Sequence, residues 1–530
     1  MAEAKESNHF PGDTESQISD SRSKKGGFIT LFFIIGTVSG VMLSGFGWLA
    51  NIIVYLVEEF NIESINASQI SNVVHGTMNM LPILGAFIAD SYVGDFAVAA
   101  ISSFISSLGI ILLTLTAKIS SLKPPPCENG SSLCQGPSKL QLGILYISIA
   151  MASAASTALI YVQDSISWGL GFGICAAANF VALAIFLAGY KFYRYDKPKG
   201  SPFTAMVRVL VAAVRKSGVK VSSKSEDYYH DEHDGTDYKV MPATPKRSFR
   251  FLNRAALKTE GDISSDGSIA RPWKLCSLQQ VEDLKTVIRL FPIWSTGIFL
   301  ATPFTTQSSI TVIQALAMDR HLGSNFKLPA ASIVVVILIS ASFFVALFDR
   351  FLFPAWQRLS GRPLTPLQRI GIGHVVNVLS MVISALVEAK RLKIAHAHHL
   401  DQAQHSAIVP MTVWWLFPQL VVVGIGDALH FPGHVGLYYQ EFPVSLRSTA
   451  TAMVSIVIGI AFYVSTALVD LIRNSTGWLP ENINNGRLDN LYWILVVTGS
   501  LNFIYFLVCA KLYKYQNMEK EVDTVSNSDM

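Results

Sequence analysis

The sequence contains little charge. Asp, Glu, Lys and Arg make up 15% of its 530 residues, whereas soluble domains average about 25%. Hydrophobic residues make up 51%, and runs of about 20 apolar residues, each long enough to cross a bilayer as a helix, recur along the chain. This composition excludes a string of soluble domains and predicts an all-α polytopic membrane protein, with the lipid bilayer as its permanent partner.

Basic charge and cysteine are also scarce. A net charge of +4 gives no basic domain, so we expect no nucleic-acid partner. Five cysteines are too few for a disulfide scaffold. Cys127 and Cys134 share a short polar loop, where a disulfide and two free thiols remain open alternatives. The sequence lacks a nucleophile–base pair, a phosphate loop and a metal-ligand spacing, so we expect no enzyme, no cofactor and no metal.

Eleven apolar spans are predicted, five before a long polar stretch and six after it. They cover roughly 28–56, 70–90, 96–117, 140–162, 168–190, 284–318, 329–354, 366–388, 411–439, 446–472 and 489–513. The domains that follow from them are a polar cytoplasmic N-terminus 1–26, an N-terminal bundle 27–190, a cytoplasmic linker 191–283, a C-terminal six-helix bundle 284–515 and a cytoplasmic tail 516–530.

The charges at the span ends conflict with five spans in the first bundle. Lys and Arg near both ends of that bundle predict that both of its ends lie in the cytoplasm. An odd number of crossings does not permit this. We therefore predict that the N-terminal bundle lacks about one helix.

The linker contains one helical pattern and one polar stretch. Phe203–Val219 has apolar residues at helical spacing with arginines between them, which fits a helix lying on the inner membrane surface or, equally, a helix packed on the bundles. Ser222–Ser248 is charged and rich in turn formers, and we expect it to be disordered.

Several segments, in order along the chain, resemble the plant nitrate/peptide transporter family, the plant branch of the proton-coupled oligopeptide transporters in the major facilitator superfamily. Others resemble its nitrate excretion subgroup. The segments for the family include Gly85–Gly94, Val162–Gly173, Phe249–Ala256, Gln280–Lys285 and Tyr438–Ser448; those for the subgroup are Phe46–Asn61, Ile293–Phe299 and His430–Pro443.

The resemblance implies two six-helix bundles with the substrate near the membrane midplane. The chain departs from this pattern near Ala150 and Met151, where the end of the fourth helix and the start of the fifth are missing, so eleven spans replace twelve. The subgroup implies low-affinity efflux of nitrate, or a similar small anion such as chloride, across the plasma membrane. The alternatives are a truncated, non-transporting isoform that regulates full-length relatives, for which a homo- or hetero-oligomer is expected, and a carrier of a larger organic anion.

The family's proton relay is absent at the matching positions. Proton-coupled members carry E-x-x-E-R on the first helix, where this chain has Val38, Val41 and Met42. The resemblance therefore implies alternating access without that relay, or an inactive protein. A histidine that some members carry on the seventh helix is replaced by Phe304, beside which Thr305 and Gln307 offer neutral donors for an anion or pack between helices.

Ionisable residues within the apolar spans are the remaining candidates for substrate binding. These are His75, Arg289, His430 and His434. Asp427 shares a helix face with the last two, and the three residues form either a pH-responsive patch or a packing cluster. We expect Pro432 and Gly433 to break this helix.

Three further residues are predicted to act in gating or structure. By resemblance, Asp90 holds the loop that follows the second span. Glu441 and Arg447 flank the cytoplasmic end of the tenth-helix equivalent, where we expect a structural ion pair.

Overall fold

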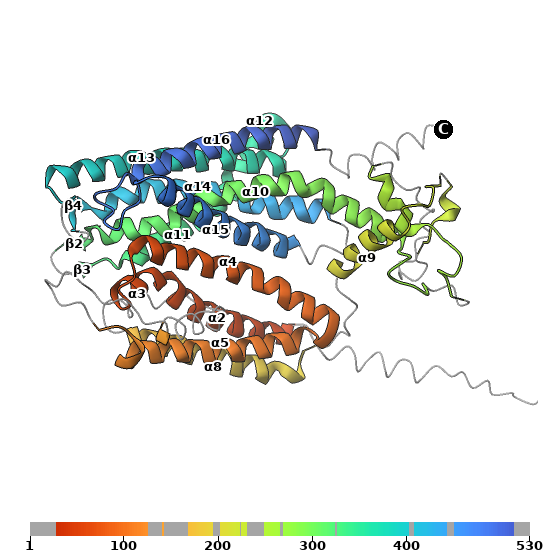
Figure 1. Ribbon diagram of the computed structural model, residues 1–530, viewed down its shortest axis with the longest axis horizontal. Coiled ribbons are helices and arrows are strands. Elements are labelled where there is room, and N and C mark those ends of the chain that lie inside the picture. The colour runs from red at the N-terminus through yellow and green to blue at the C-terminus, as the bar shows by residue number, and fades with distance from the viewer. Residues whose placement is uncertain are drawn as a thin grey trace, which may run out of the picture. The chain divides into compact units, whose positions relative to one another are not determined.

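The computed structural model describes most of the chain as helix (Figure 1). The described residues are 28–125, 140–141, 168–193, 202–222, 224–230, 248–264, 269–323, 326–401, 407–442 and 450–513. They form two compact units. Cys127, Cys134, Arg447 and the Ala150–Met151 junction lie outside the described residues, as do both ends of the chain.

The first unit is a set of three long helices with close contacts. Gly40 permits one of these contacts, because a Cβ atom at residue 40 would lie 2.9 Å from the Cβ atom of Ala182. A second pair of helices is joined by Asn179, whose side-chain amide donates a hydrogen bond to Ser106 Oγ at 3.0 Å. Small residues and interhelical hydrogen bonds are the usual means of packing helices in lipid. The helices are α2 (Phe28–Ala50), α5 (Asp95–Lys118) and α8 (Trp168–Ala188).

The second unit contains the remaining long helices. They are α3 (Ile52–Glu58), α4 (Ser64–Ile88), α9 (Pro202–Arg215), α10 (Leu278–Leu316), α11 (Val335–Leu347), α12 (Phe353–Ser360), α13 (Pro366–Ala397), α14 (Phe417–Glu441), α15 (Ala450–Ser475) and α16 (Leu488–Leu512). Short strands cover one end: β1 (Met318–Asp319) pairs with β4 (Val409–Thr412) in parallel, and β2 (His321–Leu322) pairs with β3 (Phe326–Lys327) antiparallel.

Two long helices of this unit begin with capping boxes. Ser277 caps α10 and Thr365 caps α13; each side chain accepts a hydrogen bond from the backbone of a glutamine three residues later, which reciprocates. This satisfies backbone N–H groups that a helix start leaves unpaired. The capped α10 runs for 39 residues, longer than the roughly 20 that cross a bilayer.

Among the described residues, nine helices are long and apolar enough to span a membrane. They match nine of the eleven predicted spans. The predicted span 70–90 falls in α4, which is a 25-residue helix outside this set of nine. The predicted span 140–162 lies almost entirely outside the described residues. The all-helical membrane fold is thus confirmed, with α4 as a less apolar member.

The linker is folded where it was expected to be disordered. The backbone N–H of Tyr229 donates to Ala256 O at 2.8 Å, and Leu278 N–H donates to Tyr229 O at 2.9 Å. Tyr228 is fully buried in a core that α9 and the first turns of α10 share. The prediction of disorder is wrong for residues 224–230, because the polar composition concealed this aromatic anchor.

A buried carboxylate holds the linker core together. Asp262 lies 2.8 Å from Lys216 Nζ and 3.2 Å from Lys274 Nζ, and it is fully buried. Burial raises the pKa of Asp262, but hydrogen bonds from Lys216, Thr259 and Lys274 lower it by more, so the pKa lies below its ordinary 3.8. The stabilisation from this carboxylate is present above that ordinary pKa, and it is lost as the pH falls through the folded-state value.

We expect Asp262→Asn to loosen the linker core. It removes the charge partner of Lys216, and breaking a buried ion pair costs about 3 kcal/mol. Faster protease cleavage within the linker of the full-length protein would measure this loss. Glu260→Gln is the matched control, because Glu260 is exposed two residues away; equal cleavage of both variants would contradict the role of Asp262.

Candidate substrate-binding pocket

Helix α14 carries a row of polar side chains on one face. His430 Nε2 lies 3.0 Å from Asp427 Oδ1, and His434 Nδ1 lies 2.8 Å from the His430 carbonyl. The two imidazole centroids are 6.0 Å apart, and all three residues are buried. The structure thus brings together the three residues that the sequence placed on one helix face.

The predicted break in this helix is wrong. Helix α14 continues through Pro432 and Gly433 to Glu441. A Cβ on Gly433 would lie 2.9 Å from Ile370 Cγ1, so the glycine allows α13 to approach closely. Packing of α14 against α13 holds the helix together despite the hydrogen bond that proline removes.

The histidines face a pocket between α10, α14 and α15. Its empty volume, open solvent included, is about 260 Å³. A Cβ on Gly297 would lie 3.2 Å from His434 Nε2, so the glycine leaves the room into which this nitrogen points. The residues that line this histidine pocket are Gly297, Ala301, His430, Phe431, His434, Tyr438, Val454, Val457 and Ile458.

The hydrogen bond at Nδ1 decides what His434 offers the pocket. A carbonyl only accepts, so Nδ1 must carry the proton that it donates to His430 O. Nε2 is buried and has no hydrogen-bond partner among the described residues. In the neutral ring Nε2 is an acceptor, and in the protonated ring it becomes a charged donor. Only the protonated ring therefore offers a hydrogen-bond donor at Nε2.

The position that replaces the family's seventh-helix histidine borders this pocket. Phe304 packs edge-on against Phe431, with ring centroids 6.5 Å apart. An aromatic wall thus stands where the resemblance placed an anion contact. The imidazoles of the pocket come from α14 instead.

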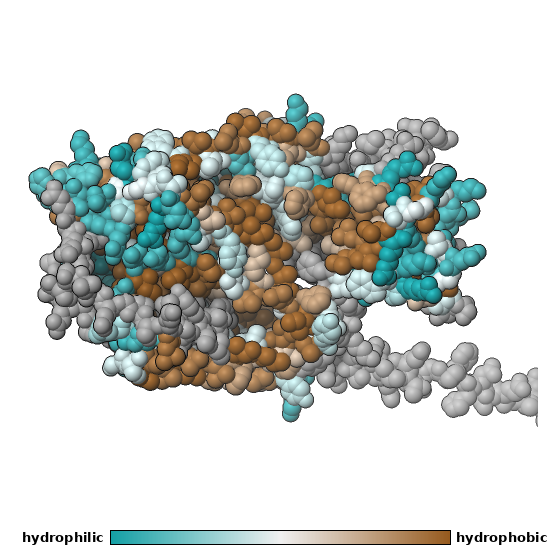
Figure 2. Space-filling view, in the orientation of Figure 1, coloured by the Kyte–Doolittle hydropathy of each residue, from teal (hydrophilic) through white to brown (hydrophobic). Residues whose placement is uncertain are grey.

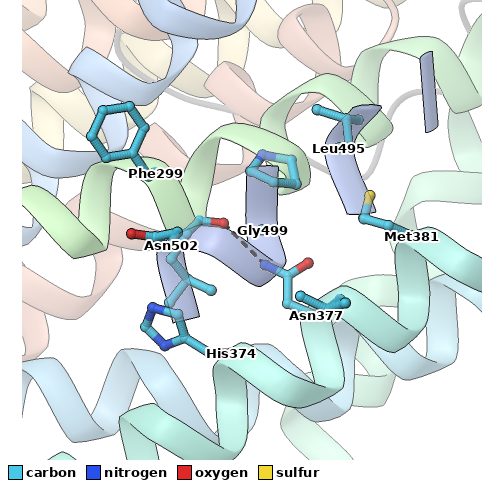
Figure 3. Close-up of a pocket in the computed structure, with 10 residues that line it drawn as sticks. Phe299, His374, Asn377, Met381, Leu495, Gly499 and Asn502 are labelled. Atoms are coloured by element: carbon cyan, nitrogen blue, oxygen red, sulfur yellow. Dashed lines mark hydrogen bonds between the residues drawn. The ribbon is translucent and has the colours of Figure 1, made fainter. Parts of the chain in front are cut away.

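A second pocket lies between α10, α13 and α16 (Figure 3). Asn377 of α13 and Asn502 of α16 donate to carbonyls of α10 at 3.0 and 2.9 Å. Within α13, His374 Nδ1 donates to the Ile370 carbonyl at 3.0 Å, because a carbonyl only accepts. These bonds fasten α13 and α16 to α10 and indicate a packing role.

The other predicted donors on α10 are used in packing. Gln307 donates to Ser384 Oγ at 2.7 Å and accepts from Ser380 Oγ at 3.3 Å. Thr305 donates to Thr302 O at 2.9 Å. Neither residue lines the histidine pocket, so the geometry favours the packing alternative for both.

His75 and Arg289 lie apart from the histidine pocket. His75 stacks on Phe462 of α15 with centroids 5.0 Å apart, in the seam between α4 and α15. Arg289 donates to Ser248 of the linker. The seam also contains the ion pair of Arg473 with Glu63 at 2.7 Å, so its polar groups join two helices.

The remaining predicted residues are distributed over both units. Val38 and Met42 of α2 are about half exposed in the first unit, and Val41 is partly buried. Asp90 lies in a π-helical turn, Ala89–Val93. Glu441 accepts a hydrogen bond from Tyr513 at 2.6 Å.

Sequence reasoning missed a fully buried ion pair. Arg391 donates to both carboxylate oxygens of Glu388 at 2.7 and 2.8 Å, and both side chains have no exposure. Gln314 adds a third bond to Glu388 at 2.6 Å, and Tyr492 donates to Gln314 at 3.0 Å. The predicted span ended at residue 388, so these two charges appeared to be a helix end; in fact α13 continues to Ala397.

The nine long apolar helices of the described residues are those of a multi-pass membrane protein. The family model described as POT family (PTR2) matches residues 134–484, and the chain belongs to this family. Arabidopsis thaliana Protein NRT1/PTR FAMILY 2.7 is 48% identical over 96% of this chain and 97% of that protein. Protein NRT1/PTR FAMILY 2.3 from the same plant is 48% identical over the same shares.

Solved structures show the same fold. An auto-inhibited POT family peptide transporter matches with a TM-score of 0.62 at 13% identity, over 91% of this chain and 96% of that one. The POT family transporter PepTSo matches with a TM-score of 0.60 at 15% identity, over 91% of this chain and 98% of that one.

The relatives contain residues that this chain lacks. The comparison with NRT1/PTR FAMILY 2.7 extends over 553 aligned positions, more than the 530 residues of the chain. Some positions of that relative therefore have no counterpart here.

We expect Gly297→Ala to weaken ligand binding in the histidine pocket. The added methyl group would lie 3.2 Å from His434 Nε2 and 3.3 Å from Val457 Cγ1, and overpacking of 1–3 kcal/mol lowers affinity by roughly tenfold. Anion-dependent thermal stabilisation of the purified protein measures it. Gly436→Ala on α14, where the nearest atom would be 4.0 Å away, should bind as the unchanged protein does. Equal loss in both variants would rule the pocket out.

Proposed function

We propose that the chain transports nitrate or a similar small anion, such as chloride, with the histidine pocket as its binding site. The observation that carries the proposal is the unpartnered Nε2 of His434, which points into a pocket whose α10 and α15 lining is apolar. A protonatable donor in a largely apolar pocket suits a small, weakly hydrated anion.

Charge balance in the pocket supports one anion at a time. Asp427 lies against His430, so protonation of His430 forms a neutral pair. Protonation of His434 then adds one positive charge, which an anion neutralises. The titratable groups that face this site are Asp427, His430 and Tyr438 on α14 and His374 on α13; the lining residues of α10 and α15 carry none.

Efflux across the plasma membrane is the direction we propose. The first-helix positions of the proton relay are occupied by Val38, Val41 and Met42, so no carboxylate there takes up a proton. An inside-negative potential drives an anion outward with about 2.3 kcal/mol per 100 mV. An alternating-access carrier without the relay therefore exports the anion down its gradient.

Nitrate flux in proteoliposomes tests this function. We expect flux that follows an imposed membrane voltage and needs no pH gradient. Nitrate, chloride and a glucosinolate as a larger organic anion should be compared at equal concentration, with protein-free liposomes as the control. Uphill nitrate uptake driven by an acid outside at zero voltage would contradict the uncoupled mechanism, and flux of the organic anion alone would contradict the substrate.

We expect His434→Gln to abolish the increase of anion flux at acidic pH. Glutamine is neutral at every pH, so the charge-assisted hydrogen bond to the anion, worth about 1.5–3 kcal/mol, is lost; flux at acidic pH should fall by roughly tenfold or more. His321→Gln is the control, because His321 is exposed and pairs with Asp319 outside the spans. A pH profile unchanged by His434→Gln would remove this histidine from the site.

The second candidate function is a non-transporting isoform that binds its full-length relatives. The aligned positions that this chain lacks favour it. Under this alternative the purified chain is folded, shows no flux of any tested anion and co-purifies with a longer relative when both are expressed together. Restoring the missing segment from a relative should then restore flux.

A further inference from the structure

Helix α9 is apolar on two opposite faces. Val209, Ala212 and Ala213 are buried in the linker core, and Lys216 follows on the same face to reach Asp262. A surface helix normally buries one apolar stripe and exposes a polar face. The core face alone therefore accounts for only half of the apolar residues of this helix.

The opposite face leaves a stripe of aliphatic side chains exposed. Val207, Leu210 and Val214, spaced three and four residues apart, are 49, 44 and 73% exposed. Figure 2 shows apolar surface bordered by hydrophilic residues in the region of α9. We call these three residues the outer stripe; packing among the described residues of the second unit leaves each of them at least 44% exposed.

One edge of the outer stripe is basic and is held in place by a tryptophan. The Arg208 guanidinium lies 5.7 Å from the Trp273 ring centroid, and Arg215 donates to the Trp273 carbonyl at 3.3 Å. Trp273 is itself 43% exposed. Helix α9 carries no acidic residue, so the charge along this edge has one sign.

The surrounding linker has the same sign of charge. Residues 202–222, 224–230, 248–264 and 269–277 contain ten Lys and Arg and four Asp and Glu. An apolar helix face with arginines at its edge and an exposed tryptophan is the chemistry of an interfacial membrane helix. The linker is joined directly to α10, a candidate membrane span, so a bilayer lies within its reach.

We infer that the outer stripe of α9 docks on the anionic leaflet of the membrane in which the protein is embedded. The aliphatic side chains enter the boundary of the acyl chains, while Arg208 and Arg215 bind lipid phosphates. The sequence left open whether this helix lies on the membrane or packs on the bundles. Under this inference it does both, because its core face packs on α10 and its outer stripe contacts lipid.

Depth measurement on the full-length protein in nanodiscs tests this inference. A nitroxide is attached at Val214→Cys and, as the matched control, at Glu260→Cys, an exposed and charged turn residue. Cys127→Ser and Cys134→Ser remove two native thiols. Cys175 and Cys509 are buried, and burial raises the pKa of the Cys276 thiol to about 11, so these react slowly; the protein with neither added cysteine gives the labelling background.

In nanodiscs that contain phosphatidylserine, we expect the label at residue 214 to be shielded from a water-soluble nickel relaxant and exposed to dissolved oxygen. The label at residue 260 should show the reverse. Each arginine near an anionic surface contributes about 1 kcal/mol, or about fivefold in binding. Arg215→Gln should therefore shift the docked population by about fivefold in anionic nanodiscs and far less in phosphatidylcholine.

Three results would overturn the inference. Equal nickel access at residues 214 and 260 would mean that the stripe faces water. Shielding from nickel and oxygen together would mean that protein, another copy or another segment of this chain, covers it. Shielding that does not depend on phosphatidylserine or on Arg215 would remove the anionic lipid from the account.

Discussion

Polar groups buried between membrane helices must find partners within the protein, because lipid supplies none. The second unit obeys this constraint along most of α10. Gln314 bonds to Glu388 at one end of the helix, Gln307 bonds to Ser384 further along, and its backbone accepts from Asn377 and Asn502. Each of these bonds fastens another helix to α10, so the packing of the unit depends on them.

The histidine pocket matters because it departs from this pattern. The lining residues of α10 and α15 form no hydrogen bond with His434 Nε2. Burying a polar nitrogen without a hydrogen-bond partner costs free energy. Elsewhere on α10, glutamine and threonine side chains donate hydrogen bonds to neighbouring helices. His434 Nε2 is therefore a buried nitrogen suited to a transient ligand, and Gly297 provides the room in front of it.

Spacing in the sequence predicted the α14 face, and composition predicted the membrane helices, because both follow from local periodicity. Three features depend on contacts between distant segments and could not be predicted in this way. Helix α14 survives Pro432 because α13 packs against it. The linker folds because Tyr228 is buried in a cluster that contains Leu252, Cys276 and Leu284, which lie more than twenty positions away. Glu388 and Arg391 lie inside the bundle because distant groups complete their ion pair: Gln314 donates to Glu388, and Arg391 donates to Asn484.

The polar residues of α10, considered one at a time, were misleading candidates for substrate binding for a related reason. A threonine or glutamine in an apolar span has the same appearance in sequence whether it binds a ligand or another helix. Thr305 donates to the Ala461 carbonyl of α15 at 3.4 Å and Gln307 donates to Ser384 of α13, and only the geometry distinguishes them from His434. A histidine four residues after another differs, since the first carbonyl fixes the second ring and leaves its far nitrogen to point away from the helix.

The continuity of α10 links the linker to the pocket. The first turns of this helix, at Leu278, Val281 and Leu284, are buried in the linker core, and the same unbroken helix reaches the pocket at Gly297 and Ala301. A linker fixed to the membrane surface would hold the start of α10 at a set depth. Movement of α10 during alternating access must then occur by bending beyond the linker core, and Pro292 and Pro303, which interrupt its hydrogen bonding on either side of Gly297, are where a helix bends most readily.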